Sequence, residues 1–457
     1  MARDFALPGR SPVYASECAV ATSHALATTT AISILKEGGN AVDAAIAASA
    51  TLCVVEPHMT GIGGDCFAIV GEADGTLHGL NGSGRSAADA SLDWYLEKGI
   101  SSLEEMSPHA VTSPGSVKAW EGIASERPEL QRTGRSMLRS FGKTMSASHN
   151  LLLNGNAPNI GEKFHMPLLA KTLREIAMNG SSAFYEGAIA KDIADTVQSL
   201  GGFLSEEDLA GVSGDWVDLI STEYQGHTLH EIPPNAQGLT AIMLVKLLAK
   251  LKSGEDVHSA ERAHLEMELG RISYAARDAY ISDENHMSYS VDELLSDGHI
   301  DKLAELYDPQ KHNSNIALPD PTGSDTIYLT VVDRDGMAVS FINSVFKWFG
   351  SGIMTPNSGI NGKISHSYGV MGGSYQAMGH AHVLSNMLDY GMDPQAALDN
   401  PRIFWDDEGA LQLEAGISET VQAQLEAKGH VCSQGAVHGG GQVIQIDHEN
   451  GVLIAGI

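Results

Sequence analysis

The sequence predicts a layered α+β protein, in which blocks of helix and blocks of strand form the layers. Helical patterns, with apolar residues at three- and four-residue steps, dominate the chain before residue 318. A polar linker, LPDPTGSD, ends this part, and two runs rich in β-branched residues follow it. Helices and strands that come in separate blocks favour layers over an alternating parallel sheet.

Two helices and two strands are expected near the N-terminus. Residues 22–37 have a helical pattern that stops at Gly38-Gly39, and Asn40 suits the N-cap of an Ala-rich helix ending near Pro57. The Gly-rich turn GIGGD leads into an apolar strand, and LHGLNGSGR predicts a second strand with a loop. Because GIGGD lacks the GxGxxG spacing, we exclude a dinucleotide fingerprint.

The middle of the chain is predominantly helical. Residues 126–162 have weak periodicity and are rich in Ser, Arg and Asn. After them, Pro167 predicts the first turn of a helix, because proline fits the first helical position. Further helices are expected over about 188–200, 237–252 and 259–281.

A β-hairpin follows the polar linker. TIYLTVV and MAVSFIN flank DRDG, which is a strong hairpin signal. If the strands pair across 333–337, partner numbers sum to 670, and a two-residue turn shifts the sum only to 671. Thr326 and Ser344 then lie at one end of the hairpin, on the same face. Beyond residue 367 we expect a Gly-rich loop, a helix over about 376–392 and short strands.

Composition excludes several classes of protein. With 28 Lys and Arg against 57 Asp and Glu, the formal charge of −29 disfavours nucleic acid and anionic membranes as partners. Four cysteines without a CxxC indicate neither a disulfide framework nor a zinc site. The first residues contain no apolar signal-peptide core, and no long apolar run follows, so a cytoplasmic location is expected.

Thr326 is the first candidate for chemistry. It follows a polar linker and starts a strand, which is a suitable place for an N-terminus that the chain makes by cutting itself. Once the Asp325–Thr326 bond is cut, the free amino group can act as the base for the Thr326 hydroxyl. Its ordinary pKa of about 7.7–8.0 suits that role. The simpler explanation is that Thr favours strands.

Two other places have the residue types that an amide-cleaving site needs. Gly372 and Gly373 precede a predicted helix, where backbone N–H groups can point at a developing oxyanion, although a tight turn also explains them. Arg85, in NGSGRS, can offer a two-donor fork to a carboxylate, although a surface arginine is the simpler interpretation.

Several separated motifs resemble the γ-glutamyltranspeptidase family, in the family's order. They are GGNAVDAAIAASATLCVVEPHMTGIGGDCFAIV, LNGSGR, GGFLSEEDL, YQGHTLHEIPPNAQG, DTIYLTVVDRDGMAVSFINS with FGSGI, and GVMGGSYQAMGHAHVLSNMLDYGMDPQAALDNPR. The resemblance covers roughly three quarters of the chain. The family's segments between its hairpin and its oxyanion loop have no counterpart in SGINGKISHSYG. Either this branch of the family lacks them or the printed sequence omits them, and we expect the second because a missing substrate strand would leave gaps in the core.

The resemblance implies a role for each candidate residue. Thr326 matches the family's processing and catalytic nucleophile, and Ser344 matches a supporting hydroxyl that is usually Thr. Gly372 and Gly373 match the oxyanion-hole glycines, and Arg85 matches the carboxylate-binding arginine.

The resemblance also implies a fold and a maturation path. The expected fold is the four-layer αββα sandwich of N-terminal-nucleophile hydrolases. Cleavage would give a large chain, 1–325, and a small chain, 326–457, which stay associated in one composite domain. No metal or other cofactor is expected, and the mature protein would work as a homo-oligomer or alone.

The expected activity is hydrolysis or acyl transfer at γ-glutamyl amide bonds through a threonine acyl-enzyme, as in glutathione metabolism. The IYL after Thr326 differs from the THF- or THY-like sequence of glutathione-processing members. This difference keeps open another small carboxylated amide as substrate, of the oxamate or glutaryl type. A non-catalytic binding protein that never matures is the third alternative.

Overall fold

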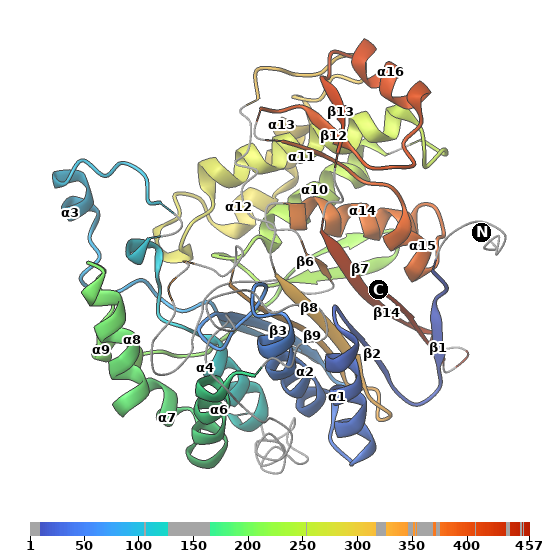
Figure 1. Cartoon of the computed structure of the whole chain (residues 1–457). Coiled ribbons are helices and arrows are strands. Elements are labelled where there is room, and N and C mark those ends of the chain that lie inside the picture. Colours follow the sequence, from blue (N-terminus) through green and yellow to red (C-terminus); the bar gives the residue numbers. More distant parts are fainter. Residues whose placement is uncertain are drawn as a thin grey trace. The chain divides into compact units, whose positions relative to one another are not determined.

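A computed structural model describes residues 10–104, 107–126, 165–252, 254–316, 326–345, 351, 353, 369–371, 375–406, 408–435, 439–447, 450 and 452–457. The chain forms two compact units (Figure 1). The hairpin unit contains residues 18–216 and 325–365, and the terminal unit contains residues 1–17, 217–324 and 366–457. Each unit therefore combines segments from both sides of residue 325.

The hairpin unit is built on a six-stranded sheet with the order β2-β8-β9-β3-β4-β5. The strands are β2 (Ala19–Thr22), β3 (Asp65–Gly71), β4 (Leu77–Gly82), β5 (Asp215–Val217), β8 (Ile327–Val332) and β9 (Ala338–Ser344). The helices are α1 (Ala25–Lys36), α2 (Ala41–Val55), α3 (Leu92–Glu97), α4 (Ser116–Glu121), α6 (Pro167–Asn179), α7 (Ser182–Tyr185), α8 (Gly187–Ser199) and α9 (Glu206–Ala210), with short turns at Pro108–Ala110 and Gly122–Glu126.

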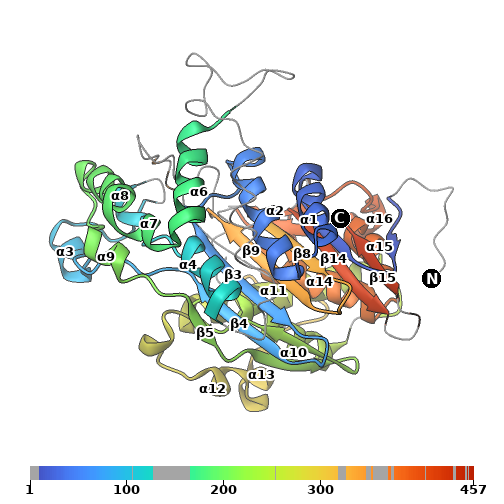
Figure 2. The same cartoon turned by 90° about the horizontal axis from the view of Figure 1, so that it is seen from below.

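Helices α1 and α2 lie side by side against one face of this sheet (Figure 2). Asn40 caps α2 as expected, because its side chain accepts the backbone N–H of Asp43 while the Asp43 carboxylate accepts that of Asn40. Small alanine side chains let α2 pack closely, and nearly every residue of the helix is buried. The face toward the helices carries apolar residues such as Cys66, Ala68 and Leu329.

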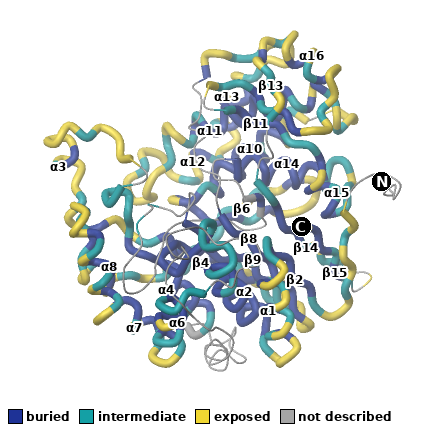
Figure 3. Tube along the Cα trace, in the orientation of Figure 1, coloured by how far each residue is buried: buried dark blue, intermediate teal, exposed yellow. Residues whose placement is uncertain are grey.

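The central hairpin has the predicted register. Ile327 pairs with Asn343, so partner numbers sum to 670, and the two-residue-turn alternative is wrong. Asp333 holds the turn, because its carboxylate accepts the backbone N–H groups of Asp335 and Met337 and, from α2, that of Ala41. Strand β8 is buried along its whole length, on both faces (Figure 3).

The terminal unit contains three smaller sheets. Their strand orders are β1-β15-β14-β10, β11-β12-β13 and β6-β7. The strands are β1 (Val13–Ala15), β6 (Ile220–Tyr224), β7 (His227–Glu231), β10 (Gly369–Met371), β11 (Ile403–Trp405), β12 (Leu411–Leu413), β13 (Cys432–Gln434), β14 (Gly440–Asp447) and β15 (Val452–Gly456). The helices are α10 (Gly238–Leu251), α11 (Ala260–Tyr280), α12 (Val291–Leu295), α13 (Asp297–Ala304), α14 (Gln376–Leu388), α15 (Pro394–Asp399) and α16 (Glu419–Ala427), with a short turn at Glu284–His286.

A second hydrophobic core fills the terminal unit. Helices α10, α11 and α14 pack on one another, and their facing residues are buried (Figure 3). The core includes Leu244, Leu269, Met378 and Trp405. This packing explains why the predicted helices over 237–252 and 259–281 form nearly at their expected bounds.

The C-terminal region differs from the prediction. The helix expected over 376–392 ends at Leu388, and Gly391 then adopts a positive φ of 64°. Where only short strands were expected, α15 and α16 form, because Asp393 and Ser418 cap their first turns. These helices are too short for a periodic pattern to reveal them. Among the described residues, no helix is long and apolar enough to cross a membrane.

Candidate active site

The two predicted hydroxyl residues meet at one end of the central hairpin. Thr326 immediately precedes β8, and Ser344 ends β9. Their Oγ atoms lie 3.0 Å apart, within hydrogen-bond distance, and either can be the donor. Thr326 is 1% exposed and Ser344 is fully buried. The pair is therefore a desolvated hydroxyl couple on a rigid strand pair.

Neighbouring strands bring other polar residues to the same edge of the sheet. Ser344 pairs in register with Asp65, the first residue of β3, and Cys66 pairs with Gly82, the last residue of β4. The end of β9, the start of β3 and the end of β4 therefore share this edge. Asp65 is fully buried and, as a register partner, lies on the same face as Ser344. Sequence reasoning missed Asp65, although an acidic residue at the start of an apolar strand was the available signal.

Asn343 is a second residue that the sequence did not single out. Its side-chain N–H groups donate to the Thr60 hydroxyl and the Gly61 carbonyl, both at 3.0 Å. Its side-chain oxygen accepts the indole N–H of Trp120 at 3.1 Å. These bonds tie the turn that contains GIGGD and helix α4 to the strand that ends in Ser344. A buried amide inside the apolar run SFIN was the signal, because such a group requires partners.

Arg85 follows β4 at the same sheet edge. Gly84 has a φ of 71°, and a side chain there would overlap the Ser113 carbonyl oxygen, so only glycine fits. The Arg85 carbonyl accepts the Ser113 N–H at 2.8 Å, which fixes the loop. The Arg85 side chain is 70% exposed and contacts the Asp215 carboxylate at 3.2 Å. It reaches solvent rather than a desolvated pocket, and an exposed ion pair of this kind is weak.

The remaining predicted site residues lie outside the described residues. These are Asp325, on the other side of the expected cleavage bond, and Gly372 and Gly373 of the expected oxyanion loop. Helix α14, which follows that loop, forms as expected and begins at Gln376.

The buried thiols are unreactive. Cys53 and Cys66 lie in the hairpin unit's core as free thiols. Burial raises the pKa of Cys53 to about 12, and burial together with the neighbouring Asp65 raises that of Cys66. Neither thiol is therefore a nucleophile at neutral pH, and the hydroxyl couple remains the candidate.

Within the described residues, one group of side chains has the composition of a metal site. His264, Glu268 and His430 lie together in the terminal unit. They belong to α11 and to the loop before β13, not to the hairpin that carries Thr326.

Known sequences place the chain in one family over nearly its full length. The family described as Gamma-glutamyltranspeptidase matches residues 27–133, 127–361 and 361–457. The "Glutathione hydrolase-like YwrD proenzyme" of Bacillus subtilis is 30% identical, over 90% of this chain and 90% of that protein. The "Oxamate amidohydrolase proenzyme" of Klebsiella pneumoniae is 28% identical, over 89% of each chain.

Solved structures agree with the sequence comparison. The cephalosporin acylase from Bacillus halodurans is 31% identical with a TM-score of 0.84, covering 100% of this chain and 97% of that one. The γ-glutamyltranspeptidase of Helicobacter pylori, at 23% identity and a TM-score of 0.58, covers 65% of this chain and 94% of its own, and shows the fold alone. The mixed helix and sheet fold is thus that of N-terminal-nucleophile hydrolases. The chain belongs to the γ-glutamyltranspeptidase family, and it is an N-terminal-nucleophile amidohydrolase made as a self-processing proenzyme.

Proposed function

We propose that the chain cuts itself between Asp325 and Thr326 and then uses Thr326 to cleave the amide bond of a small carboxylated substrate, in the first place a γ-glutamyl amide. The observation that supports this proposal is the buried contact of 3.0 Å between the Thr326 and Ser344 hydroxyl oxygens. In a desolvated setting, each hydroxyl must find its hydrogen-bond partner within the protein. This contact supports a role for Ser344 in orienting the Thr326 hydroxyl.

In the proposed self-cleavage, the reacting group is the hydroxyl of Thr326, which directly precedes strand β8. Its hydroxyl oxygen attacks the carbonyl carbon of residue 325, and the acyl group moves from the backbone nitrogen to that oxygen. Water then hydrolyses the resulting ester. This step frees the backbone α-carboxylate of Asp325 and the α-amino group of Thr326. The anchoring of β8 and β9 in the middle of the sheet holds the attacking hydroxyl in place during these steps.

The same hydroxyl then acts on the substrate. The new amino group takes the Thr326 proton, and the hydroxyl oxygen attacks the amide carbonyl. The amino group then gives that proton to the leaving amine, and an acyl-enzyme forms. Water or an amino acid releases the acyl group, which gives hydrolysis or transfer. In this proposal the N–H groups of Gly372 and Gly373 stabilise the oxyanion, and one such donor typically contributes about 2.7–4 kcal/mol.

Arg85 is proposed to bind the substrate carboxylate. It shares the sheet edge with Ser344, and its guanidinium reaches solvent, where an incoming ligand can meet it. Asp215 occupies part of its hydrogen-bonding capacity. A substrate carboxylate would therefore share Arg85 with Asp215 or displace it.

A second substrate class has its own support. One relative, at 28% identity over nearly the full length, acts on oxamate according to its name, and an acylase is among the similar solved structures. The IYL sequence after Thr326 also differs from that of glutathione-processing members. Oxamate or a glutaryl-type amide is thus the alternative. We also propose that the layers of the fold stack as αββα, and that the two chains stay associated after cleavage.

The decisive experiment compares variants of two threonines on one strand. Thr326→Ala should purify as a single intact chain without amidase activity, because cleavage and catalysis need the same hydroxyl. Thr326→Ser should still mature. Thr330→Ala, four residues further along β8 on the same face, should mature and turn over normally. Mass spectrometry reports the chains, and assays with γ-glutamyl anilide, oxamate and glutaryl amides report the substrate.

If the Thr326→Ala variant is still cleaved into two chains, Thr326 is not the nucleophile of self-cleavage. An intact wild-type chain without activity would instead favour a non-catalytic binding protein.

A further inference from the structure

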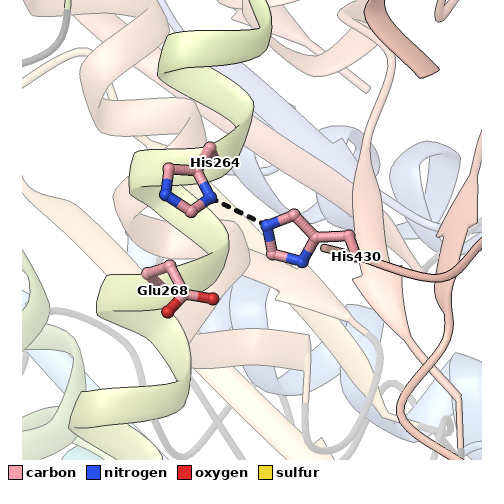
Figure 4. A group of neighbouring side chains, drawn as sticks. All are labelled: His264, Glu268 and His430. Carbon is pink, nitrogen blue, oxygen red and sulfur yellow. Dashed lines mark hydrogen bonds between the residues drawn. The ribbon is translucent and has the colours of Figure 1, made fainter. Parts of the chain in front are cut away.

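We propose that His264, Glu268 and His430 bind one divalent metal ion of the zinc type, at a site in the terminal unit (Figure 4). This site is independent of the hydroxyl couple of the proposed active site. Its role is structural, because the ion would tie α11 to the loop before β13.

The three side chains converge from two elements. His264 and Glu268 are four residues apart on α11, so they project from one face of the helix, and His430 approaches from the loop (Figure 4). Their ligand atoms all lie within 4.8 Å of one another. His264 Nδ1 and His430 Nε2 are 2.8 Å apart. Ligand atoms on one tetrahedral zinc ion are roughly 3.3 Å apart, so a small side-chain movement admits an ion.

Neighbouring groups orient the ligands as metal sites require. The Nε2–H of His264 donates to the backbone carbonyl of Asp308 at 2.9 Å. This bond fixes the tautomer whose Nδ1 lone pair points into the cluster. The Glu268 carboxylate accepts the ring N–H of His312 at 2.7 Å and the backbone N–H of Asn313 at 2.9 Å, which leaves further lone pairs on its oxygens.

The ligand set selects the class of ion. Two imidazole nitrogens with one carboxylate suit Zn²⁺, whereas Mg²⁺ and Ca²⁺ prefer sets made entirely of oxygen. All three ligand side chains are buried.

Access and charge are also compatible with an ion. A cavity of about 590 Å³ is lined by His430, His312 and Arg271, so water can complete a fourth coordination position. Arg271, one turn beyond Glu268 on α11, is a buried cation that lines the same cavity, and its guanidinium donates to the Ile316 carbonyl.

The experiment titrates chelator-treated, untagged full-length protein with Zn²⁺, and with Co²⁺ as a spectroscopic probe. We expect one ion per chain, the intense visible absorption of tetrahedral Co²⁺, and a melting temperature that rises with Zn²⁺ but not with Mg²⁺. His430→Ala should abolish all three signals. His312→Ala, which removes a partner of Glu268, should weaken binding by about 10–100-fold. His258→Ala, an exposed histidine of the same unit, is the matched control and should bind as wild type.

Three outcomes would overturn the site. One is the absence of stoichiometric Zn²⁺ or Co²⁺ binding by the wild type. Another is an equal loss in His258→Ala. If His430→Ala does not fold, X-ray absorption on the zinc-loaded wild type decides, because a first shell without two imidazoles contradicts the assignment. None of these readouts depends on amidase activity, so the proposed function stands or fails separately.

Discussion

At the scale of single residues, the proposed chemistry depends on two hydroxyl groups that are removed from water. A buried hydroxyl must find its hydrogen-bond partners within the protein. Thr326 and Ser344 are buried together with 3.0 Å between their oxygens. A buried Cys66 on the same sheet has a pKa raised by burial and does not compete as a nucleophile. The hydroxyl couple is thus the focus of the proposed reaction.

Ser344→Ala is expected to slow both self-cleavage and turnover by about fivefold, because one neutral hydrogen bond typically contributes about 1 kcal/mol. Ser340→Ala is the matched control. Ser340 lies on the same strand and face, and its hydroxyl contacts the Tyr328 hydroxyl at 2.8 Å, away from Thr326. Rates of maturation and of steady-state hydrolysis measure the effect. Equal rates in both variants would reduce Ser344 to a strand residue.

Arg85→Lys is expected to lower kcat/KM for carboxylated substrates by roughly tenfold, because an ammonium cannot reproduce the planar fork and one charge-assisted bond contributes about 1.5 kcal/mol. Self-cleavage involves no external carboxylate and should persist. Asp215→Asn removes the competing carboxylate and should leave substrate capture unchanged or improved. If maturation and capture collapse together in Arg85→Lys, the arginine supports the loop instead of the substrate.

At the scale of single elements, helix α11 contributes both apolar packing and a buried ion pair to the terminal unit. Inside the terminal unit, Glu266 on this helix contacts Arg262 at 2.9 Å and His382 of α14 at 3.0 Å. Burial alone would raise the pKa of Glu266, but its two partners outweigh burial and lower the pKa to about 2. The ordinary value is 4.5, so the folded state prefers the carboxylate.

This depressed pKa predicts acid sensitivity. The stabilisation by Glu266 is present above pH 4.5 and is lost as the pH falls toward about 2. Glu266→Gln should lower the free energy of unfolding by about 3 kcal/mol at pH 7, because it leaves buried Arg262 without its carboxylate. The difference from wild type should vanish near pH 2. Glu261→Gln, on an exposed position of the same helix, is the control, and denaturant titrations between pH 2 and 7 measure both. A difference that is independent of pH would contradict the ion-pair explanation.

At the scale of the whole molecule, the six-stranded sheet contains strands from both sides of residue 325. Strands β8 and β9 lie between β2 and β3, which come from the first part of the chain. In the terminal unit, β1 likewise pairs with β15. Removing β8 and β9 would leave two unpaired strand edges and open the hairpin unit's core.

The mature chains should therefore stay together after cleavage. We expect the two fragments to co-elute in size-exclusion chromatography in native buffer and to separate only in strong denaturant, where Thr326→Ala still gives one chain. The physical reason is that separation would expose the buried faces of β8 and β9 to water. Fragments that separate in native buffer would show that the strands before residue 325 do not hold the small chain.

The sequence alone determined the local elements and the identity of the nucleophile candidate. Asn40 signals its capping box through its own neighbours, and the DRDG turn sets the register that places Thr326 opposite Ser344, because hairpin pairing is a local property. Short helices such as α16 were missed, since nine residues carry too little periodicity.

Only the tertiary structure decided which distant residues meet. Asp65 and Asn343 gain their positions from the order of strands in the sheet, and the sequence spacing contains no sign of this. His264 and His430 are separated by 166 residues and come together only when the terminal unit's core forms. Arg85 faces solvent and Asp215 because the loop after β4 is held by Ser113. Contacts between distant segments depend on the packing of whole elements, and local patterns do not encode that packing.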